Sequence, residues 1–188
     1  MLMRYIIADL EATCWERRTD RTQMEIIEIG AVVLQSAAGP LGEEFSRFIR
    51  PIASPKLSPF CMELTSIRQE DVDGADYFWT VFPEFTDWIG PEPFVLCSWG
   101  VYDLYQFQTD CRRCGLPFPD TLSKHLNLKK TFARLKNIRP CGMSKALEIM
   151  SIPLSGRHHR ATDDARNIAK LALLLLPELE KNGTMTEA

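Results

Sequence analysis

The sequence contains no apolar run long enough to cross a membrane. The apolar run Leu171–Leu176 near the C-terminal end is followed by Pro177 and is far shorter than the roughly 20 residues that a membrane helix needs. Residues 5–8 are too few for a secretory signal, and acids follow them without a small-residue cleavage site. We therefore expect a cytoplasmic protein that does not associate with membranes.

The sequence also lacks low-complexity segments, internal repeats and any linker rich in proline and serine. With 188 residues, of which 45% are hydrophobic and 25% charged, it has the length and composition of one ordered domain. We expect that domain to cover residues 1–181 and the polar tail, residues 182–188, to be frayed.

A second pair of closely spaced cysteines is missing. Cys111 and Cys114 have the spacing of a zinc or redox pair, and the other four cysteines are scattered singly. All six are expected to be reduced. Cys111 and Cys114 could therefore bind zinc with other residues, or pack as thiols on one side of a helix.

The chain carries no excess of positive charge. Its net charge of −3 argues against a nucleic-acid-binding protein, because phosphate contacts need lysine and arginine. Residues 129–139, however, contain five cations and no acid. This segment is either a substrate-facing strip or a solvated helix face.

Apolar runs and turn residues predict an α/β fold in which helices flank a mixed sheet of about five strands, the first three antiparallel. Strands are expected at residues 3–11, 24–34, 44–50, 94–99 and, more briefly, 123–128. Helices are expected at residues 60–65, 81–89, 102–114, 128–136, 144–150 and 162–181.

Two acids end the first expected strand. Asp9 and Glu11 are two residues apart, so their carboxylates point to the same face of the strand. Such close like charges repel each other unless a cation lies between them. Taken alone, the pair could simply be solvated at the strand end.

A third acid, Asp103, follows another apolar strand, and Gly100 permits the tight turn between that strand and the next helix. Alone, Asp103 could be a carboxylate that stabilises a helix N-terminus. In α/β sheets, however, ligands bind beyond the carboxyl ends of the strands, which is where Asp103 and the Asp9/Glu11 pair are expected.

Helical periodicity selects one acid from the segment before the last helix. Residues at helical spacing from Asp164 are mostly apolar, whereas those from Asp163 are mostly polar, so Asp164 is expected at a site and Asp163 in solvent. His159 lies within reach of anything that Asp164 binds, and a histidine can accept a proton from water at neutral pH. His158 fits a surface or capping histidine better.

These residues suit hydrolysis of a phosphodiester. Two divalent cations about 3.5 to 4 Å apart can neutralise the phosphate, activate water and stabilise the leaving oxygen. Mg²⁺ prefers oxygen ligands, which four carboxylates supply. Cations bound there would also offset part of the chain's negative charge.

Asp9-Leu-Glu11, Trp99-Gly-x-x-Asp103 and His159-x4-Asp164 resemble the three motifs of the DEDDh 3′→5′ exonucleases, an RNase H-like family. The resemblance covers residues 5–176 and is greatest to the branch of the histone-mRNA 3′ exonuclease. The stretches similar to that branch are residues 9–15, 25–30, 64–67, 69–72 and 114–118.

The resemblance implies a hydrolase that releases 5′-mononucleotides from single-stranded RNA or 3′ overhangs, with His159 as general base. Two Mg²⁺ or Mn²⁺ ions would be bound by Asp9, Glu11, Asp103 and Asp164. A DNA exonuclease of the same mechanism and a non-catalytic RNA-binding module are the alternatives. The expected substrate contacts are Leu10, Ala12, Met62, Leu64, Thr65, Trp99, Lys129 and Lys130.

Two positions depart from the family pattern. Ser66 stands where the family often has a glycine close to the 3′-terminal nucleotide, so its Cβ could alter that fit. Trp99 lies four positions before Asp103, whereas some relatives have tryptophan directly before the aspartate. Because only eight residues precede Asp9, we expect target choice to come from this domain or from a partner.

Overall fold

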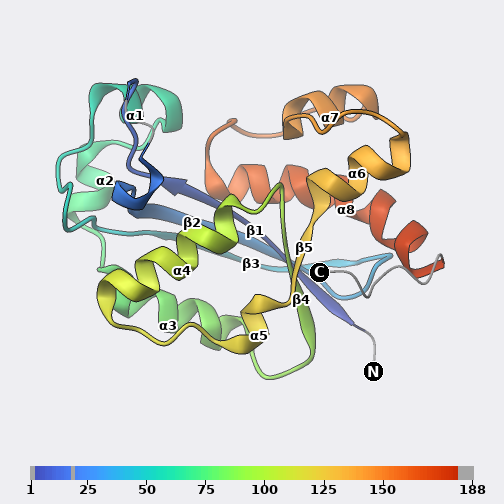
Figure 1. Ribbon diagram of the computed structural model, residues 1–188, viewed down its shortest axis with the longest axis horizontal. Coiled ribbons are helices and arrows are strands. Elements are labelled where there is room, and N and C mark those ends of the chain that lie inside the picture. The colour runs from blue at the N-terminus through green and yellow to red at the C-terminus, as the bar shows by residue number, and fades with distance from the viewer. Residues whose placement is uncertain (1–2, 18–19, 182–188) are drawn as a thin grey trace.

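The computed structural model describes residues 3–17 and 20–181 (Figure 1). The predicted frayed tail, residues 182–188, lies outside these ranges. The strands are β1 (Arg4–Ala12), β2 (Ile26–Leu34), β3 (Leu41–Phe48), β4 (Phe94–Ser98) and β5 (His125–Asn127). The helices are α1 (Pro59–Thr65), α2 (Gln69–Asp73), α3 (Phe78–Ile89), α4 (Tyr102–Cys114), α5 (Asp120–Ser123), α6 (Leu128–Lys136), α7 (Met143–Ile149) and α8 (Ala161–Lys181), with a 3-10 turn at Arg21–Gln23.

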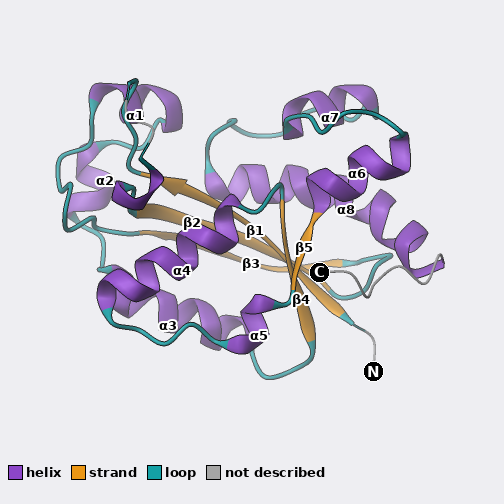
Figure 2. Ribbon diagram, in the orientation of Figure 1, coloured by secondary structure: helices purple, strands orange, loops and turns teal. Residues whose placement is uncertain are grey.

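The five strands form one mixed sheet in the order β3-β2-β1-β4-β5, with helices packed on both faces (Figure 2). β2 is antiparallel to β1 and β3, whereas β4 is parallel to β1 and β5. The carboxyl ends of β1, β4 and β5 therefore lie at the same edge of the sheet. The predicted α/β fold, including three antiparallel strands at the start, is confirmed.

Alternation along β1 divides the core into two layers. Tyr5 and Ile7 pack on one face with apolar residues of α6, α7 and α8, whereas Ile6, Ala8 and Leu10 pack on the other with those of α3 and α4. Continuing the same alternation, Asp9 and Glu11 fall on the face covered by α8. The side-chain period of a strand thus determines which helix meets the two acids.

Most of the predicted elements are confirmed within two or three residues, and both α4 and α6 have the expected bounds. The main correction concerns α3, which begins at Phe78 rather than near residue 81 and includes Pro83. Pro83 lies in the second turn, and the aromatic residues Phe78, Phe82 and Phe85 bury one face there. The short helices α2 and α5 and the 3-10 turn were missed, because three to five residues contain too little apolar periodicity.

The remaining structural expectations concern the membrane and the cysteines. Among the described residues, no helix combines the length and apolar character that a bilayer crossing requires. Cys111 and Cys114 are free thiols that pack on α4 against the α3 layer of the core. No metal-ligating group found among the described residues includes them. Cys111 and Cys114 therefore agree with the interpretation that they pack as thiols on one side of a helix.

α8 approaches β2 closely at Gly30. A Cβ on Gly30 would lie 2.1 Å from the carbonyl carbon of Ala161 and 2.1 Å from the amide nitrogen of Thr162. Backbone atoms cannot move aside as a flexible side chain can, so a glycine is required. Gly30 also pairs with Asp9 across the sheet, which places the first turn of α8 directly over the acids of β1.

We predict that Gly30→Ala destabilises the protein by about 1 to 3 kcal/mol or more, because α8 must move away from the sheet. Urea unfolding followed by circular dichroism measures the change. Gly74→Ala is the matched control, since its Cβ would meet only the Glu70 carbonyl oxygen at 3.6 Å, an ordinary contact. Equal stability of the two variants would contradict the close approach.

Candidate active site

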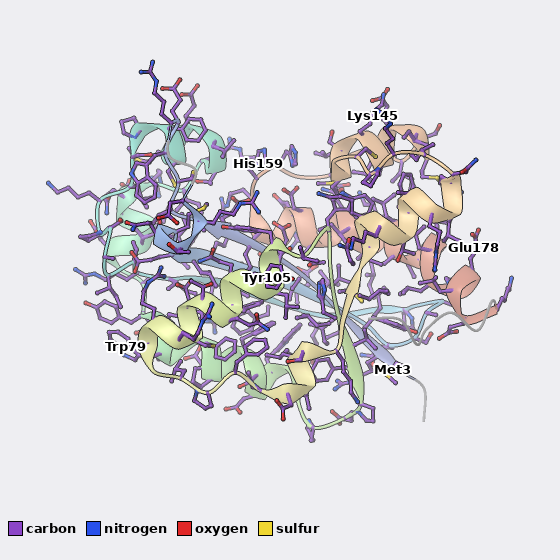
Figure 3. All side chains as sticks on the ribbon, viewed as in Figure 1. Met3, Trp79, Tyr105, Lys145, His159 and Glu178 are labelled. Atoms are coloured by element: carbon purple, nitrogen blue, oxygen red, sulfur yellow. The ribbon has the colours of Figure 1, made fainter. Side chains whose placement is uncertain are left out.

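Four carboxylates from three elements meet at the carboxyl edge of the sheet. Asp9 and Glu11 lie near the end of β1, Asp103 in the first turn of α4, and Asp164 in the first turn of α8. Carboxylate oxygens of Asp9, Glu11 and Asp164 all lie within 4.8 Å of one another. All four acids line one cleft of about 290 Å³. In Figure 3, His159 lies at the mouth of this region, between α1 and α7.

The acids are placed where their charged forms are costly. Burial raises the pKa of Asp9 well above its ordinary range, and the charges of Asp103, Glu11 and Asp164 raise it further. Burial, followed by repulsion from Asp164 and Glu28, raises the pKa of Glu11 to about 9. Without a counter-charge, Glu11 retains its proton at neutral pH.

This arrangement fits divalent metal ions. The donors are all carboxylate oxygens, which Mg²⁺ and Mn²⁺ prefer. No ion pair among the described residues gives Asp9, Glu11 or Asp103 an arginine or lysine partner within 4.0 Å. Their repulsion is thus left for a bound cation to relieve.

Asp103 is oriented by hydrogen bonds from its surroundings. Burial raises its pKa to about 6, whereas hydrogen bonds from the Ser98 hydroxyl and the backbone amides of Asp103 and Leu10 act in the opposite direction. The Ser98 oxygen also lies 2.8 Å from Nε2 of His125. Both residues are buried, and burial lowers the pKa of His125 to about 4, so the imidazole is neutral. A buried polar chain therefore links β5 to Asp103 through Ser98.

Both histidines lie beside Asp164. The backbone N–H of His159 donates to Oδ2 of Asp164 at 2.9 Å, and its φ of 63° places this residue in the left-handed region. Nδ1 of His158 lies 3.0 Å from the same oxygen, and the two rings stack with centroids 4.0 Å apart. His158 is exposed, as expected, but its interpretation as a surface or capping histidine missed its contact with Asp164.

The loop before α8 is fixed by side chains of that helix. Asn167, which is fully buried, accepts from the Ser155 amide at 3.0 Å and donates to the Ser155 carbonyl at 2.8 Å. Asp163 is half-buried rather than fully solvated, and accepts from the Arg157 amide at 2.9 Å. Asp164 is buried, as predicted, and faces the cleft. Sequence periodicity therefore separated the two aspartates correctly but missed the anchoring role of Asp163.

A buried ion pair joins this loop to the sheet. Glu28, opposite Glu11 in β2, is 1% exposed and accepts from Arg160 at 3.1 and 3.2 Å and from the Ala161 amide at 3.0 Å. Because Arg160 follows His159 directly, the pair fixes where the histidines and the start of α8 sit relative to β1.

Only some of the residues expected to contact substrate line the cleft. Leu10 and Trp99 line the cleft, but the indole N–H of Trp99 donates to the Cys141 carbonyl at 3.0 Å and its ring packs on Phe132. Trp99 therefore also fixes one wall of the cleft. Ala12 is buried next to Glu11, and Lys129 and Lys130 lie in the first turn of α6.

The other expected contacts lie on α1, outside the set of residues that line the cleft. Thr65 is fully buried and donates to the Cys61 carbonyl, Leu64 is exposed, and Met62 packs beside the small core under α1. Ser66 ends α1 with a φ of 60°, a conformation that favours glycine. Ser66 thus retains the backbone geometry of the expected glycine while adding a Cβ.

Comparison with known proteins identifies the family. The RNase T exonuclease family model matches residues 6–172. ERI1 exoribonuclease 2 of Xenopus laevis is 35% identical over 189 residues, covering 89% of this chain and 27% of the relative. The chain belongs to the DEDDh exonuclease family. The structure of the 3′hExo nuclease domain, a DEDDh member bound to rAMP, matches with a TM-score of 0.87 and 28% identity over 99% of this chain and 96% of that one.

The expected similarity to the histone-mRNA branch is also confirmed. A structure of a 3′-exonuclease recognising the histone mRNA stem-loop matches with a TM-score of 0.88 and 28% identity, covering 94% of this chain and 64% of that one. Membership of the DEDDh family implies catalysis with divalent metal. The chain spans only about a quarter of the length of the ERI1 exoribonuclease 2 from Xenopus.

Several residues that support the candidate site could not be identified from the sequence. Glu28 and Gly30 lie in a strand that is buried along its whole length, where the sequence pattern gives no indication of which neighbour each residue meets. A charged residue inside such an apolar strand was nevertheless a signal, because a buried carboxylate requires a partner. His125 and Asn167 gave no comparable signal.

We predict that the metal-free protein becomes less stable as pH rises. The folded-state pKa of Glu11 exceeds its ordinary value of 4.5, so the folded protein binds more protons than the unfolded chain up to about pH 9. The stabilisation is complete below pH 4.5 and is lost as pH rises through about 9. Thermal melting in EDTA should show a falling Tm, and Mn²⁺ should raise Tm most at the alkaline end.

The matched variants test the source of that dependence. Glu11→Gln removes one titrating group and should flatten the Tm profile, whereas Glu148→Gln removes an exposed acid of α7 and should leave it unchanged. A Tm in EDTA that does not vary across this pH range would contradict the proposed electrostatic repulsion.

We also predict that Arg160→Gln is more destabilising than the double variant Glu28→Gln/Arg160→Gln. The single change leaves the Glu28 carboxylate buried without a charged partner, which costs about 3 to 5 kcal/mol at full burial and less here because Arg160 is partly exposed. The free energy of unfolding in urea is measured for these two variants and for Glu28→Gln, which completes the double-mutant cycle. If the changes in unfolding free energy of the two single variants add up to that of the double variant, the pair does not interact.

Proposed function

We propose that this chain is a 3′→5′ exoribonuclease that removes nucleotides from single-stranded RNA or 3′ overhangs. The observation that carries the proposal is the convergence of Asp9, Glu11, Asp103, His159 and Asp164 at one cleft. The exoribonuclease relatives and the rAMP in the related nuclease domain support RNA as the substrate.

We further propose that Asp9, Glu11, Asp103 and Asp164 hold two Mg²⁺ or Mn²⁺ ions. When bound, such ions neutralise the scissile phosphate, activate the attacking water and stabilise the leaving oxygen. The chain's own part is to hold the acids in register. β1 fixes Asp9 and Glu11 on one face, Ser98 orients Asp103, and the close contact at Gly30 positions the helix that carries Asp164.

His159 is proposed as the general base. Burial, and then the charge of His158, lowers its pKa, so at neutral pH the imidazole is unprotonated and able to accept a proton from water. The water oxygen attacks phosphorus, the bond to the 3′ oxygen breaks, and a 5′-mononucleotide leaves. The hydrogen bond between the His159 amide and Asp164 keeps the base beside the acid cluster.

The nucleotide contacts remain proposals based on the family resemblance. Leu10 and Trp99 line the cleft and are placed to meet the terminal nucleotide, whereas Met62, Leu64 and Thr65 would approach it from α1. Aromatic and apolar side chains of this kind provide stacking surfaces that tolerate different bases.

The test is hydrolysis of a 5′-labelled RNA followed over time with Mg²⁺, with Mn²⁺ and with EDTA. Asp103→Asn should lower turnover about a hundredfold or more, because metal-assisted charge stabilisation contributes several kcal/mol. Asp87→Asn, an exposed acid on α3, is the matched control and should retain activity.

Three outcomes would change the proposal. Hydrolysis that persists in EDTA would exclude metal-dependent catalysis. Equal rates on the matching deoxyoligonucleotide would show that the 2′-hydroxyl is not selected, in favour of the DNA alternative. Tight RNA binding without any hydrolysis would favour the non-catalytic module.

A further inference from the structure

The cations of α6 and of the turn after it lie close together in the sequence with no acid among them. They form a group that we call the α6 strip, which consists of Lys129, Lys130, Arg134, Lys136 and Arg139. None of the ion pairs among the described residues involves any of them. Elsewhere, arginines such as Arg47, Arg68 and Arg166 lie within 3.5 Å of a carboxylate.

The α6 strip starts at the edge of the catalytic cleft. Asn127, which pairs with Ser98 across β4 and β5, caps α6, so the helix begins at the carboxyl edge of the sheet. The Lys129 side chain extends toward Gly100, and a Cβ on that glycine would lie 3.7 Å from Nζ. From there α6 runs away from β5 toward α7 (Figure 1).

Helical spacing orients the strip toward solvent. Leu128 and Phe132 are buried in the core on the inner face of α6. Lys130 and Arg134, four residues apart, form one exposed row, and Lys136 lies about two turns from Lys129 on its flank. A solvated helix face usually mixes acids with bases, but residues 129–139 contain no acid. The segment thus carries positive charge that no ion pair among the described residues neutralises, although the charge of Lys129 lowers the pKa of Asp103.

We propose that the α6 strip binds phosphates of the RNA strand on the 5′ side of the nucleotide being removed. The inference rests on the proposed function, because it requires that a strand end lies in the cleft. A chain with a net charge of −3 and a group of buried acids repels RNA at long range. Unpaired cations next to the cleft supply local attraction where the rest of the strand must pass.

The test compares two double variants with the same change in charge. Lys130→Gln/Arg134→Gln removes two strip cations, and Arg47→Gln/Lys145→Gln removes two cations that pair with Glu84 and Glu148. Fluorescence anisotropy of a 12-nucleotide uridine RNA, in an Asp103→Asn background with Mg²⁺, gives affinity against salt. Each lost phosphate contact lowers the slope of log K against log salt by about 0.7.

The slope of log K against log salt should therefore be smaller by about 1.4 in the strip variant than in the wild type. Over a fourfold rise in salt, the factor by which affinity falls should be about sevenfold smaller in the variant. The control pair should keep the wild-type slope. Lys130→Arg/Arg134→Lys retains both charges and should keep it as well, which separates charge from any effect on folding. The proposal would be overturned by an unchanged slope in Lys130→Gln/Arg134→Gln. A loss of slope in Arg47→Gln/Lys145→Gln as large as that in the strip variant would overturn it as well.

Substrate length separates this proposal from the proposed function. With the catalytic acids intact, the ratio of kcat/KM on the 12-nucleotide RNA to kcat/KM on a dinucleotide should be lower in the strip variant than in the wild type, and this difference should shrink about sevenfold over a fourfold rise in salt. An unchanged ratio, with the wild type hydrolysing both substrates, would reject the strip and leave the exoribonuclease proposal in place. Failure of the wild type to hydrolyse either substrate would reject the exoribonuclease proposal itself.

Discussion

Mutual repulsion among the buried carboxylates at one end of the sheet is the constraint on which the site depends. Asp9 and Glu11 are held on one face by the strand period, and neither has a basic partner within ion-pair distance among the described residues. An arginine paired with them would relieve the repulsion and compete with a metal ion for the same oxygens. The fold therefore has to hold these acids together by other means.

Those means lie in the neighbouring strand. Gly30 removes the side chain that would keep α8 away from β2, and Glu28 binds Arg160 and the first amide of that helix. Glu28 also adds to the negative charge around Glu11, so its role is not simply favourable. Arg160 pairs with Glu28 and is not among the residues that line the cleft. One contact thus anchors the histidine loop without supplying a cation to the catalytic acids.

The sheet and the burial of Asp164 could be predicted from the sequence because both leave periodic signals. The spacing of Asp9 and Glu11 predicted a shared face, and apolar periodicity separated Asp164 from Asp163. Contacts between segments distant in the chain leave no such signal. Ser98 and His125 lie 2.8 Å apart across two parallel strands, and His158 contacts Asp164 from the residue before the left-handed His159.

The net charge of −3 argues against nucleic-acid binding, but it does not show where the charges lie. Four acids lie inside the cleft, where bound cations would offset their charge, although the net charge of the chain counts them fully. Some basic residues are engaged by carboxylates, such as Arg113 with Asp110, whereas those of the α6 strip form no ion pair among the described residues. The cations of the α6 strip therefore remain available to an anionic strand. Recognition of a polyanion by an acidic protein therefore requires that unpaired cations lie outside the metal site but adjacent to it, as Lys129 does beside Gly100.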